Sequence, residues 1–328
     1  MARARESLID LDATSYYHCI NRCIRRSYLC GDDKYSGNNF DHRRGWLVER
    51  IKLLATIFSI DIAAYAILSN HYHLVLKVNR DEALACSDDE VIARWYQLYH
   101  GCVLIDRYLA GEVLDEACLL RISEVVSKWR ARLYDISWFM RNLNEFIARK
   151  ANLEDNCTGR FWEGRFKSQA LLDETAVLSC MMYVDLNPIR AKMADSLQSS
   201  DFTSIQERIK QYKSFQKQQI KLNEDVTVLP QPNSLLPFGK NKDKDSIPFT
   251  LFDYLELAEF SGKLILPNKR GSIDSNRPAL LKILDIESDS WINTIKHFRR
   301  QYANFAGSKT SLIKCAHAHH HSWYKGCA

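Results

Sequence analysis

Residues 62–78 are the part of the sequence that most restricts the fold. The apolar run 62–68 and the segment 71–78 flank Ser69-Asn70, a dipeptide typical of turns. The pattern predicts a β-hairpin in which both strands are mostly buried. The chain must therefore contain a sheet, and the segments around the hairpin decide how that sheet is completed.

The flanking segments predict further strands and helices. In chain order they are a strand at 15–21, a helix at about 43–59, the hairpin, a helical insertion at about 80–133, a helix at 138–152, a turn and strand at 159–168, and a helix after Asp173 that reaches Tyr183 and Asn187 near Pro188. This order approaches the βαββαβ arrangement of ferredoxin-like folds. We therefore expect an α+β fold with an antiparallel ferredoxin-like sheet.

The sequence also predicts how the chain divides into domains. Residues 1–200 form the first domain, and 80–133 are an insertion within it. Residues 216–247 are rich in Gln, Lys, Asn and Pro, which is typical of a linker. Apolar residues then recur in 248–328, which predicts a small C-terminal module of about three short helices.

Composition restricts the class of protein more than its function. The chain has 328 residues, of which 46% are hydrophobic, and this excludes disordered and fibrous classes. No apolar run approaches the roughly 18 residues of a membrane span, and the first residues lack an apolar signal core. The ten cysteines form no Cys-x-x-Cys motif, which favours free thiols. We expect a cytoplasmic protein without a membrane partner, and a net charge of +5 permits nucleic acid without requiring it.

His71 and His73 are the sharpest chemical feature. On a strand they project from one face, with Tyr72 on the other, so both imidazoles can reach one ion. Imidazole suits Mn²⁺ or Zn²⁺ and suits Mg²⁺ less well. Histidines at this spacing are also common as packed or half-exposed residues, and only a third converging group would favour metal binding.

Tyr183 and Asn187 are four residues apart and are expected on one helix face. Asn187 can offer a carbonyl oxygen to an ion beside the Tyr183 hydroxyl, and a phenol can attack a phosphodiester that a cation polarises. The alternative is that Tyr183 belongs to the core and that Asn187-Pro188 ends the helix.

Basic residues gather in two segments that also contain aromatic residues. They are Arg22, Arg25, Arg26, Arg160, Arg165 and Lys167, interleaved with Tyr28, Phe161, Trp162 and Phe166. Grooves for single-stranded nucleic acid combine such residues to bind phosphates and stacked bases. The alternative is that these residues are ordinary solvated side chains on the surface, with the aromatic residues in the core.

A C-terminal cluster between Cys315 and Cys327 contains four histidines but matches no usual zinc spacing.

These motifs together resemble the REP-associated tyrosine transposases. The resemblance rests on Tyr17-His18, Asn21-Arg22, Ser69-Asn-His-Tyr-His-Leu-Val-Leu76, Trp162-Glu-Gly-Arg-Phe-Lys-Ser168 and Tyr183-Val-Asp-Leu-Asn-Pro-Ile-Arg-Ala191. It covers about residues 1–200 in the family's order. The long 80–133 segment and the module after residue 247 depart from the family's compact pattern.

The resemblance implies a single-strand DNA transposase of the HUH nuclease superfamily. Carried over residue by residue, His71 and His73 bind a divalent metal, Mg²⁺ or Mn²⁺, and Tyr183 becomes linked to a DNA 5′ phosphate. Asn187 is the expected third ligand. The expected partner is single-stranded DNA, in particular DNA folded into hairpins.

Two other functions remain open from the residues alone. A non-catalytic single-stranded nucleic-acid-binding protein would bind hairpins equally well without Tyr183 and without metal. A metal-dependent phosphodiesterase using activated water would cleave DNA without a covalent link to Tyr183.

Overall fold

The computed structural model describes residues 8–24, 29–32, 37–222, 231–239, 245–265 and 278–327. Its strands are β1 (Tyr16–Arg22), β2 (Ile60–Ile67), β3 (His71–Val78), β4 (Lys167–Leu171) and β5 (Phe305–Ala306). The helices before β4 are α1 (His42–Ile57), α2 (Arg80–Ala85), α3 (Asp88–Tyr96), α4 (Val103–Leu109), α5 (Glu116–Leu133) and α6 (Ile136–Glu154). Those after β4 are α7 (Glu174–Asp185), α8 (Asn187–Arg190), α9 (Ser204–Leu222), α10 (Leu251–Ile265), α11 (Ala279–Ile283), α12 (Ser288–Gln301) and α13 (Lys309–Ala318).

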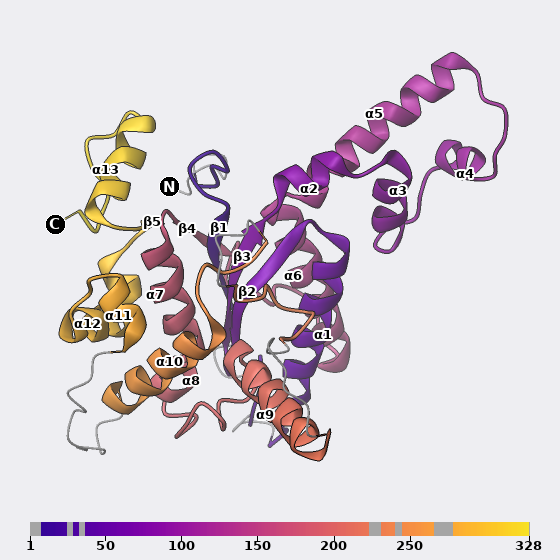
Figure 1. Ribbon diagram of the computed structural model, residues 1–328. Helices are drawn as coiled ribbons and strands as arrows, with labels where there is room; N and C mark the ends of the chain where they lie inside the picture. Colours follow the sequence, from indigo (N-terminus) through magenta and orange to yellow (C-terminus); the bar gives the residue numbers. More distant parts are fainter. Residues whose placement is uncertain are drawn as a thin grey trace. The chain divides into compact units, whose positions relative to one another are not determined.

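The five strands form one sheet in the order β2-β3-β1-β4-β5 (Figure 1). β1 pairs antiparallel with both β3 and β4, and the short β5 pairs parallel with β4. The order of the first four strands is that of a ferredoxin-like sheet. The predicted α+β class with its hairpin at residues 62–78 is therefore confirmed.

The register of β1 and β3 determines which side chains share a face. Ile20 lies opposite His73, and Arg22 lies opposite His71. Because directly opposed residues of an antiparallel pair project to the same side, both histidines share one face, as predicted. Tyr72 projects to the other face, where its ring meets the edge of Trp162 at 5.7 Å.

The chain forms two compact units. The first comprises residues 1–45, 62–77 and 160–328, and the second comprises 46–61 and 78–159. The C-terminal helices belong to the first unit and share one hydrophobic core with the strands, a core that includes Val75, Tyr183, Tyr254, Trp291 and Phe298. The predicted boundaries at 200 and 248 thus differ from these two units, because α12 packs against α7 and α10 packs against α8, α11 and α12.

The predicted linker at 216–247 also differs from the observed elements. Helix α9 continues to Leu222, and residues 231–239 and 245–247 contribute Leu236, Phe238 and Ile247 to the core of the first unit. The remainder of this segment, 223–230 and 240–244, lies outside the described residues.

The second unit is helical, as predicted for residues 80–133. Aromatic rings form its centre: Trp95 stacks on Trp129 at 5.9 Å and meets the edge of Trp138 at 5.5 Å. Ser87 begins α3 with a reciprocal capping box to Glu90.

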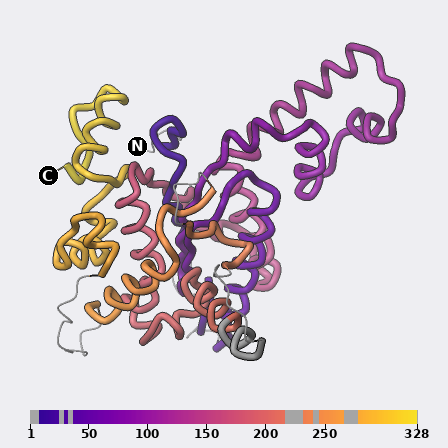
Figure 2. Tube along the Cα trace, viewed as in Figure 1, coloured from indigo at the N-terminus to yellow at the C-terminus, as the bar shows by residue number. Residues whose placement is uncertain are grey.

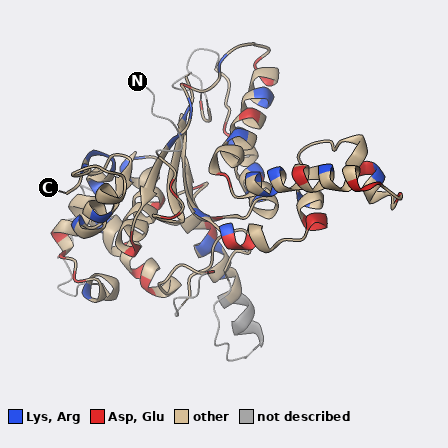
Figure 3. Ribbon diagram, turned by 90° about the horizontal axis from the view of Figure 1, so that it is seen from above, with Lys and Arg blue, Asp and Glu red and all other residues tan. Residues whose placement is uncertain are grey.

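Charged side chains of both signs are mixed over the surface. Lys and Arg are interspersed with Asp and Glu in Figure 3, in line with 45 basic and 40 acidic residues. No described helix is long and apolar enough to cross a membrane.

Helix α7 positions Tyr183. It begins after Asp173, whose Oδ1 accepts a hydrogen bond from the Ala176 amide at 2.9 Å, so the predicted N-cap is confirmed. It ends at Asp185, and Asn187 begins the separate turn α8. Tyr183 and Asn187 therefore lie on two consecutive helical segments rather than on the single helix expected from their spacing.

Candidate active site

His73 is the centre of a buried polar cluster in the first unit. Its side chain is fully buried on β3. The Nδ1 atom lies 2.9 Å from Nε2 of His18 on β1, and the Nε2 atom lies 3.1 Å from Nδ2 of Asn187 on α8. The Tyr183 ring meets the His73 ring edge-on, with 5.6 Å between ring centres. Asn187 and Tyr183, the two residues predicted beside the histidines, thus lie against His73.

Donor and acceptor roles follow from the chemistry of a neutral imidazole, which has one N–H and one lone pair. The Asn187 amide nitrogen donates to Nε2 of His73, so His73 donates through Nδ1 to His18. His18 then donates through Nδ1 to Oε1 of Gln169 at 3.3 Å. Gln169 donates through Nε2 to the Ala303 carbonyl at 2.7 Å. The last acceptor is a backbone carbonyl, which can only accept a hydrogen bond. This fixes which atom donates in each of the bonds before it.

Burial keeps all three histidines neutral. Desolvation lowers the pKa of His18 to about 4, against a smaller opposing effect of the Gln169 hydrogen bond and with a small further lowering by the Arg299 cation. Desolvation also lowers the pKa of His71 to about 4, followed by the Arg22 cation and then Arg299. Desolvation and the neighbouring charges hold the pKa of His73 well below its usual value. Neutral imidazole is the metal-binding form, so no proton has to leave at neutral pH before a nitrogen can coordinate.

His71 lies at the accessible edge of this cluster. Its ring is 5.0 Å from the ring of His73, and its Nδ1 atom lies 2.6 Å from Oδ1 of Asn70. Because Asn70 occupies Nδ1, Nε2 is the nitrogen that can reach an ion. A hydrogen bond to the other ring nitrogen is the usual support of a metal-ligating histidine.

Two side chains from other parts of the chain lie over the ring of Tyr183. Phe298 of α12 stacks on it at 5.6 Å with an angle of 28° between the planes, and the Arg190 guanidinium carbon lies 4.5 Å from its ring centre. The side chain is 6% exposed. Within the described residues the Tyr183 hydroxyl makes no hydrogen bond, and its oxygen is not one of the fully buried polar atoms that lack a partner. The hydroxyl oxygen is therefore part of the 6% of the side chain that solvent can reach.

The predicted nucleic-acid contacts separate into four groups. Arg22 is half-buried beside His71, and Arg165 and Lys167 are exposed and line a cavity of about 500 Å³. Arg160 is exposed but does not line that cavity. Arg25 and Arg26 lie outside the described residues.

Two of the aromatic residues predicted to interleave with these cations pack inside the protein. Phe161 is 2% exposed and Trp162 is 8% exposed, and their rings contact each other at 4.9 Å. Neither presents a face for a base to stack on. Phe166 is half-buried and lines the cavity.

The C-terminal histidine cluster has a structural role at His319. Its Nε2 atom lies 2.8 Å from Oδ2 of Asp10, and its Nδ1 atom lies 2.9 Å from the Tyr324 hydroxyl. Figure 2 shows the first described residues beside α13, the C-terminal helix that ends just before His319. These contacts connect the two ends of the described chain.

Several residues of the site were not identified as functional from the sequence. They are His18, Gln169, Phe298 and Arg299. His18 had one signal, its place on a strand next to Tyr17 in a motif of the resembled family. Phe298 and Arg299 had none, because nothing in a sequence pattern indicates that α12 packs against α7, more than 100 residues earlier.

The donor set at this site fits a divalent cation only if an amide takes part. Among the described residues, no three His, Cys, Asp or Glu side chains are arranged to hold one ion. His71 and His73 supply two imidazole nitrogens, and rotation of the Asn187 amide would present its oxygen where its nitrogen now faces His73. Two imidazoles and one amide oxygen suit Mn²⁺ and accept Mg²⁺ less readily.

Comparison with known proteins gives one structural likeness. No protein-family model matches the chain, and no curated protein matches it. A solved structure described as "Structure of the REP associates tyrosine transposase bound to a REP hairpin" is similar over 64% of this chain and 86% of its own length, with 13% identity and a TM-score of 0.38.

Proposed function

We propose that this protein is a metal-dependent single-stranded DNA transposase or endonuclease that cleaves and rejoins hairpin-containing DNA through a 5′-phosphotyrosine link. One observation carries the proposal. Tyr183 and Asn187 converge on His73, with the Tyr183 ring at 5.6 Å and the Asn187 amide at 3.1 Å. A nucleophile, an amide ligand and neutral imidazoles are the groups that this chemistry requires.

In this proposal His71, His73 and Asn187 hold Mg²⁺ or Mn²⁺. The bound cation would supply polarisation of the scissile phosphate and stabilisation of the leaving oxygen. Support for the ligand set comes from the low pKa values of the imidazoles, whose first cause is burial. Further support comes from Asn70, which engages His71 through Nδ1 and leaves Nε2 for coordination.

The chain's own residues perform the substitution. The Tyr183 oxygen forms a bond to phosphorus and releases its proton, while the bond from phosphorus to the 3′ oxygen breaks and that oxygen takes up a proton. The 5′ phosphate is then esterified to Tyr183. Because the link is again a phosphodiester, a 3′ hydroxyl can attack it in reverse and join strands without ATP. Phe298 and Arg190 hold the phenol ring in place for both steps.

The test is detection of the covalent link. Wild type and Tyr183→Phe are incubated with end-labelled single-stranded hairpin oligonucleotides and Mn²⁺ or Mg²⁺, then separated on a denaturing gel. We expect a protein-linked label in wild type and none in Tyr183→Phe. Tyr212→Phe, on α9, is the matched control and retains the adduct. Cleavage by Tyr183→Phe without an adduct would instead identify a hydrolase that uses activated water.

A second function, hairpin binding without cleavage, is favoured by one observation. Tyr183 is only 6% exposed, and a buried tyrosine stacked on Phe298 also serves as core. A binding protein would retain its affinity for hairpins in Tyr183→Phe and in EDTA, and wild type would form no adduct.

A further inference from the structure

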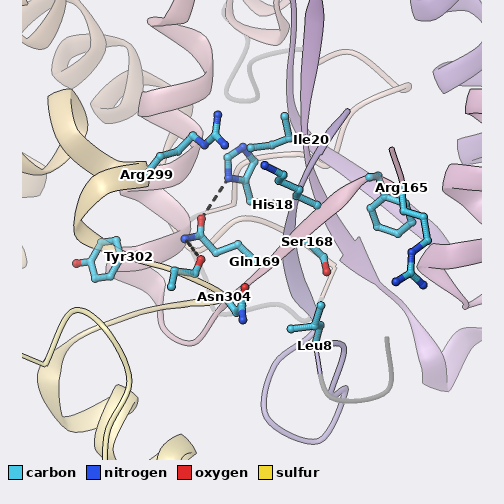
Figure 4. Close-up of a pocket in the computed structure, with 12 residues that line it drawn as sticks. Leu8, His18, Ile20, Arg165, Ser168, Gln169, Arg299, Tyr302 and Asn304 are labelled. Atoms are coloured by element: carbon cyan, nitrogen blue, oxygen red, sulfur yellow. Dashed lines mark hydrogen bonds between the residues drawn. The ribbon is translucent and has the colours of Figure 1, made fainter. Parts of the chain in front are cut away.

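A cavity of about 500 Å³ lies beside the candidate active site in the first unit. Figure 4 shows its walls: β1 and β4 on one side, and the end of α12 with the segment that follows it on the other. This volume falls in the range of roughly 300–1,000 Å³ that small-ligand pockets occupy. It is therefore large enough for one nucleotide.

Among the described residues, three cations and no acidic side chain line the cavity. Arg165 and Lys167 come from β4 and the loop before it, and Arg299 comes from α12. All three are exposed, and in the part of the chain that the structure describes none of them forms an ion pair or a side-chain hydrogen bond. An un-neutralised cluster of this kind attracts a phosphate.

The remaining walls present groups that contact a base. Tyr302 is half-buried, and its ring is braced edge-on by Phe298 at 5.2 Å. Asn304 adds an amide, which both donates and accepts.

One imidazole separates this cavity from His73. His18 lines the cavity and also lies 2.9 Å from His73 through its Nε2 atom. Arg299, on the opposite wall, is close enough for its charge to act on His18, His71 and His73. A strand whose phosphate lies at His71 and His73 can therefore continue directly into the cavity.

We propose that this cavity binds one unpaired nucleotide of the DNA strand next to the phosphate that is cleaved, with its base against Tyr302 and Asn304 and its phosphate among Arg165, Lys167 and Arg299. The assignment rests on the proposed function for its position relative to the cleaved phosphate. The binding of a base and a phosphate rests on the cavity alone. The C-terminal segment after residue 298 thereby becomes part of the substrate site.

The test separates base contacts from phosphate contacts. Fluorescence anisotropy measures binding of the full chain, in EDTA, to labelled dT12 and to a strand of twelve abasic deoxyribose phosphates. Tyr302→Leu retains apolar packing on Phe298 but cannot stack on a base. We expect it to weaken dT12 binding about tenfold and to leave abasic-strand binding unchanged, because one stacked base contributes an effect of this order.

Arg299→Gln and Arg300→Gln form the matched pair for the phosphate contact. They are adjacent exposed arginines on α12, and only Arg299 lines the cavity. We expect Arg299→Gln to weaken both strands and to lower the slope of log K against log salt by about 0.7, the value for one phosphate contact on a single strand. Arg300→Gln should match wild type.

Three results overturn the proposal: no binding of dT12, equal effects of Tyr302→Leu on the two strands, or equal effects of the two arginine variants. These outcomes are separate from failure of the proposed function. A chain that forms the Tyr183 adduct but does not distinguish dT12 from the abasic strand disproves only the nucleotide cavity. A chain with base-dependent binding and no adduct disproves only the cleavage chemistry.

Discussion

Nε2 of His18 lies 2.9 Å from Nδ1 of His73, and the two imidazole rings are stacked with only 16° between their planes. His18 is itself held by Gln169, which is bonded to the backbone at Ala303. His73 therefore cannot rotate without breaking a chain of hydrogen bonds. Its Nε2 atom stays directed at Asn187, on the side where the proposed metal would bind.

Replacing His18 with Leu should weaken metal binding by roughly 10- to 100-fold, the usual effect of losing a hydrogen bond that orients a ligand. Leu fills the buried volume but makes neither of the bonds of His18. Titration with Mn²⁺, followed by the electron paramagnetic resonance signal of the free ion, measures the affinity without DNA. His317→Leu, at an exposed position, is the control. Equal affinities in wild type and His18→Leu would rule out the orienting role.

The double variant His71→Ala/His73→Ala should lose both Mn²⁺ binding and the protein–DNA adduct, because it removes both imidazole ligands. The fold should persist, since the strand pairs through its backbone with β1 and β2. Far-ultraviolet circular dichroism checks the fold, and the gel assay checks cleavage. Unchanged nicking by a folded double variant would remove these residues from the mechanism.

Asp185 should make stability fall as the pH rises between about 4 and 6. Burial is the first cause that raises its pKa from 3.8 to about 6, although Ser204 and Tyr254 donate hydrogen bonds to it at 2.5 and 2.6 Å. The native state therefore keeps a proton that the unfolded chain loses above pH 3.8. This contribution is complete below pH 3.8 and is lost by about pH 6, which amounts to about 3 kcal/mol at 1.36 kcal/mol per pKa unit.

Urea unfolding of wild type and Asp185→Asn across this pH range isolates the effect. Histidines that titrate in the same window contribute equally to both proteins and cancel in the difference. We expect the unfolding free energy of wild type to fall relative to Asp185→Asn as the pH rises from 4 to 6. A difference that stays constant would show that Asp185 is ionised throughout.

Phe298→Ala should lower the free energy of unfolding by about 3–5 kcal/mol, as other large-to-small core substitutions do. Phe298 is fully buried and contacts Tyr183, so the loss would demonstrate that the C-terminal helices stabilise the sheet. Phe252→Ala, on α10 and 65% exposed, is the control and should change stability by no more than about 0.5 kcal/mol. Similar small effects from both variants would mean that the C-terminal helices fold independently.

Local patterns in the sequence were sufficient for most of the elements. The two-residue period of a strand places His71 and His73 on one face and Tyr72 on the other, whatever surrounds them. Asp173 identifies the start of α7, because its side chain caps the helix by a bond to Ala176, only three residues away. Both features depend only on residues close together in the chain, so they can be predicted from one sequence without the fold. The roles of Tyr183 and Asn187 stay a prediction.

The tertiary structure alone decided which distant residues meet these faces. The β1–β3 register brings His18 to His73 across 55 residues, and packing of α12 brings Phe298 to Tyr183 and Arg299 to the imidazoles. The same packing places Tyr302 and Asn304 beside β4 and forms the cavity. A periodic pattern predicts that one face of an element will be buried, but it does not predict which segment will cover that face. Burial against many different apolar segments would be equally favourable, because the hydrophobic effect is not directional. The sequence therefore determined the chemistry of the histidine strand, and the fold determined the groups around it.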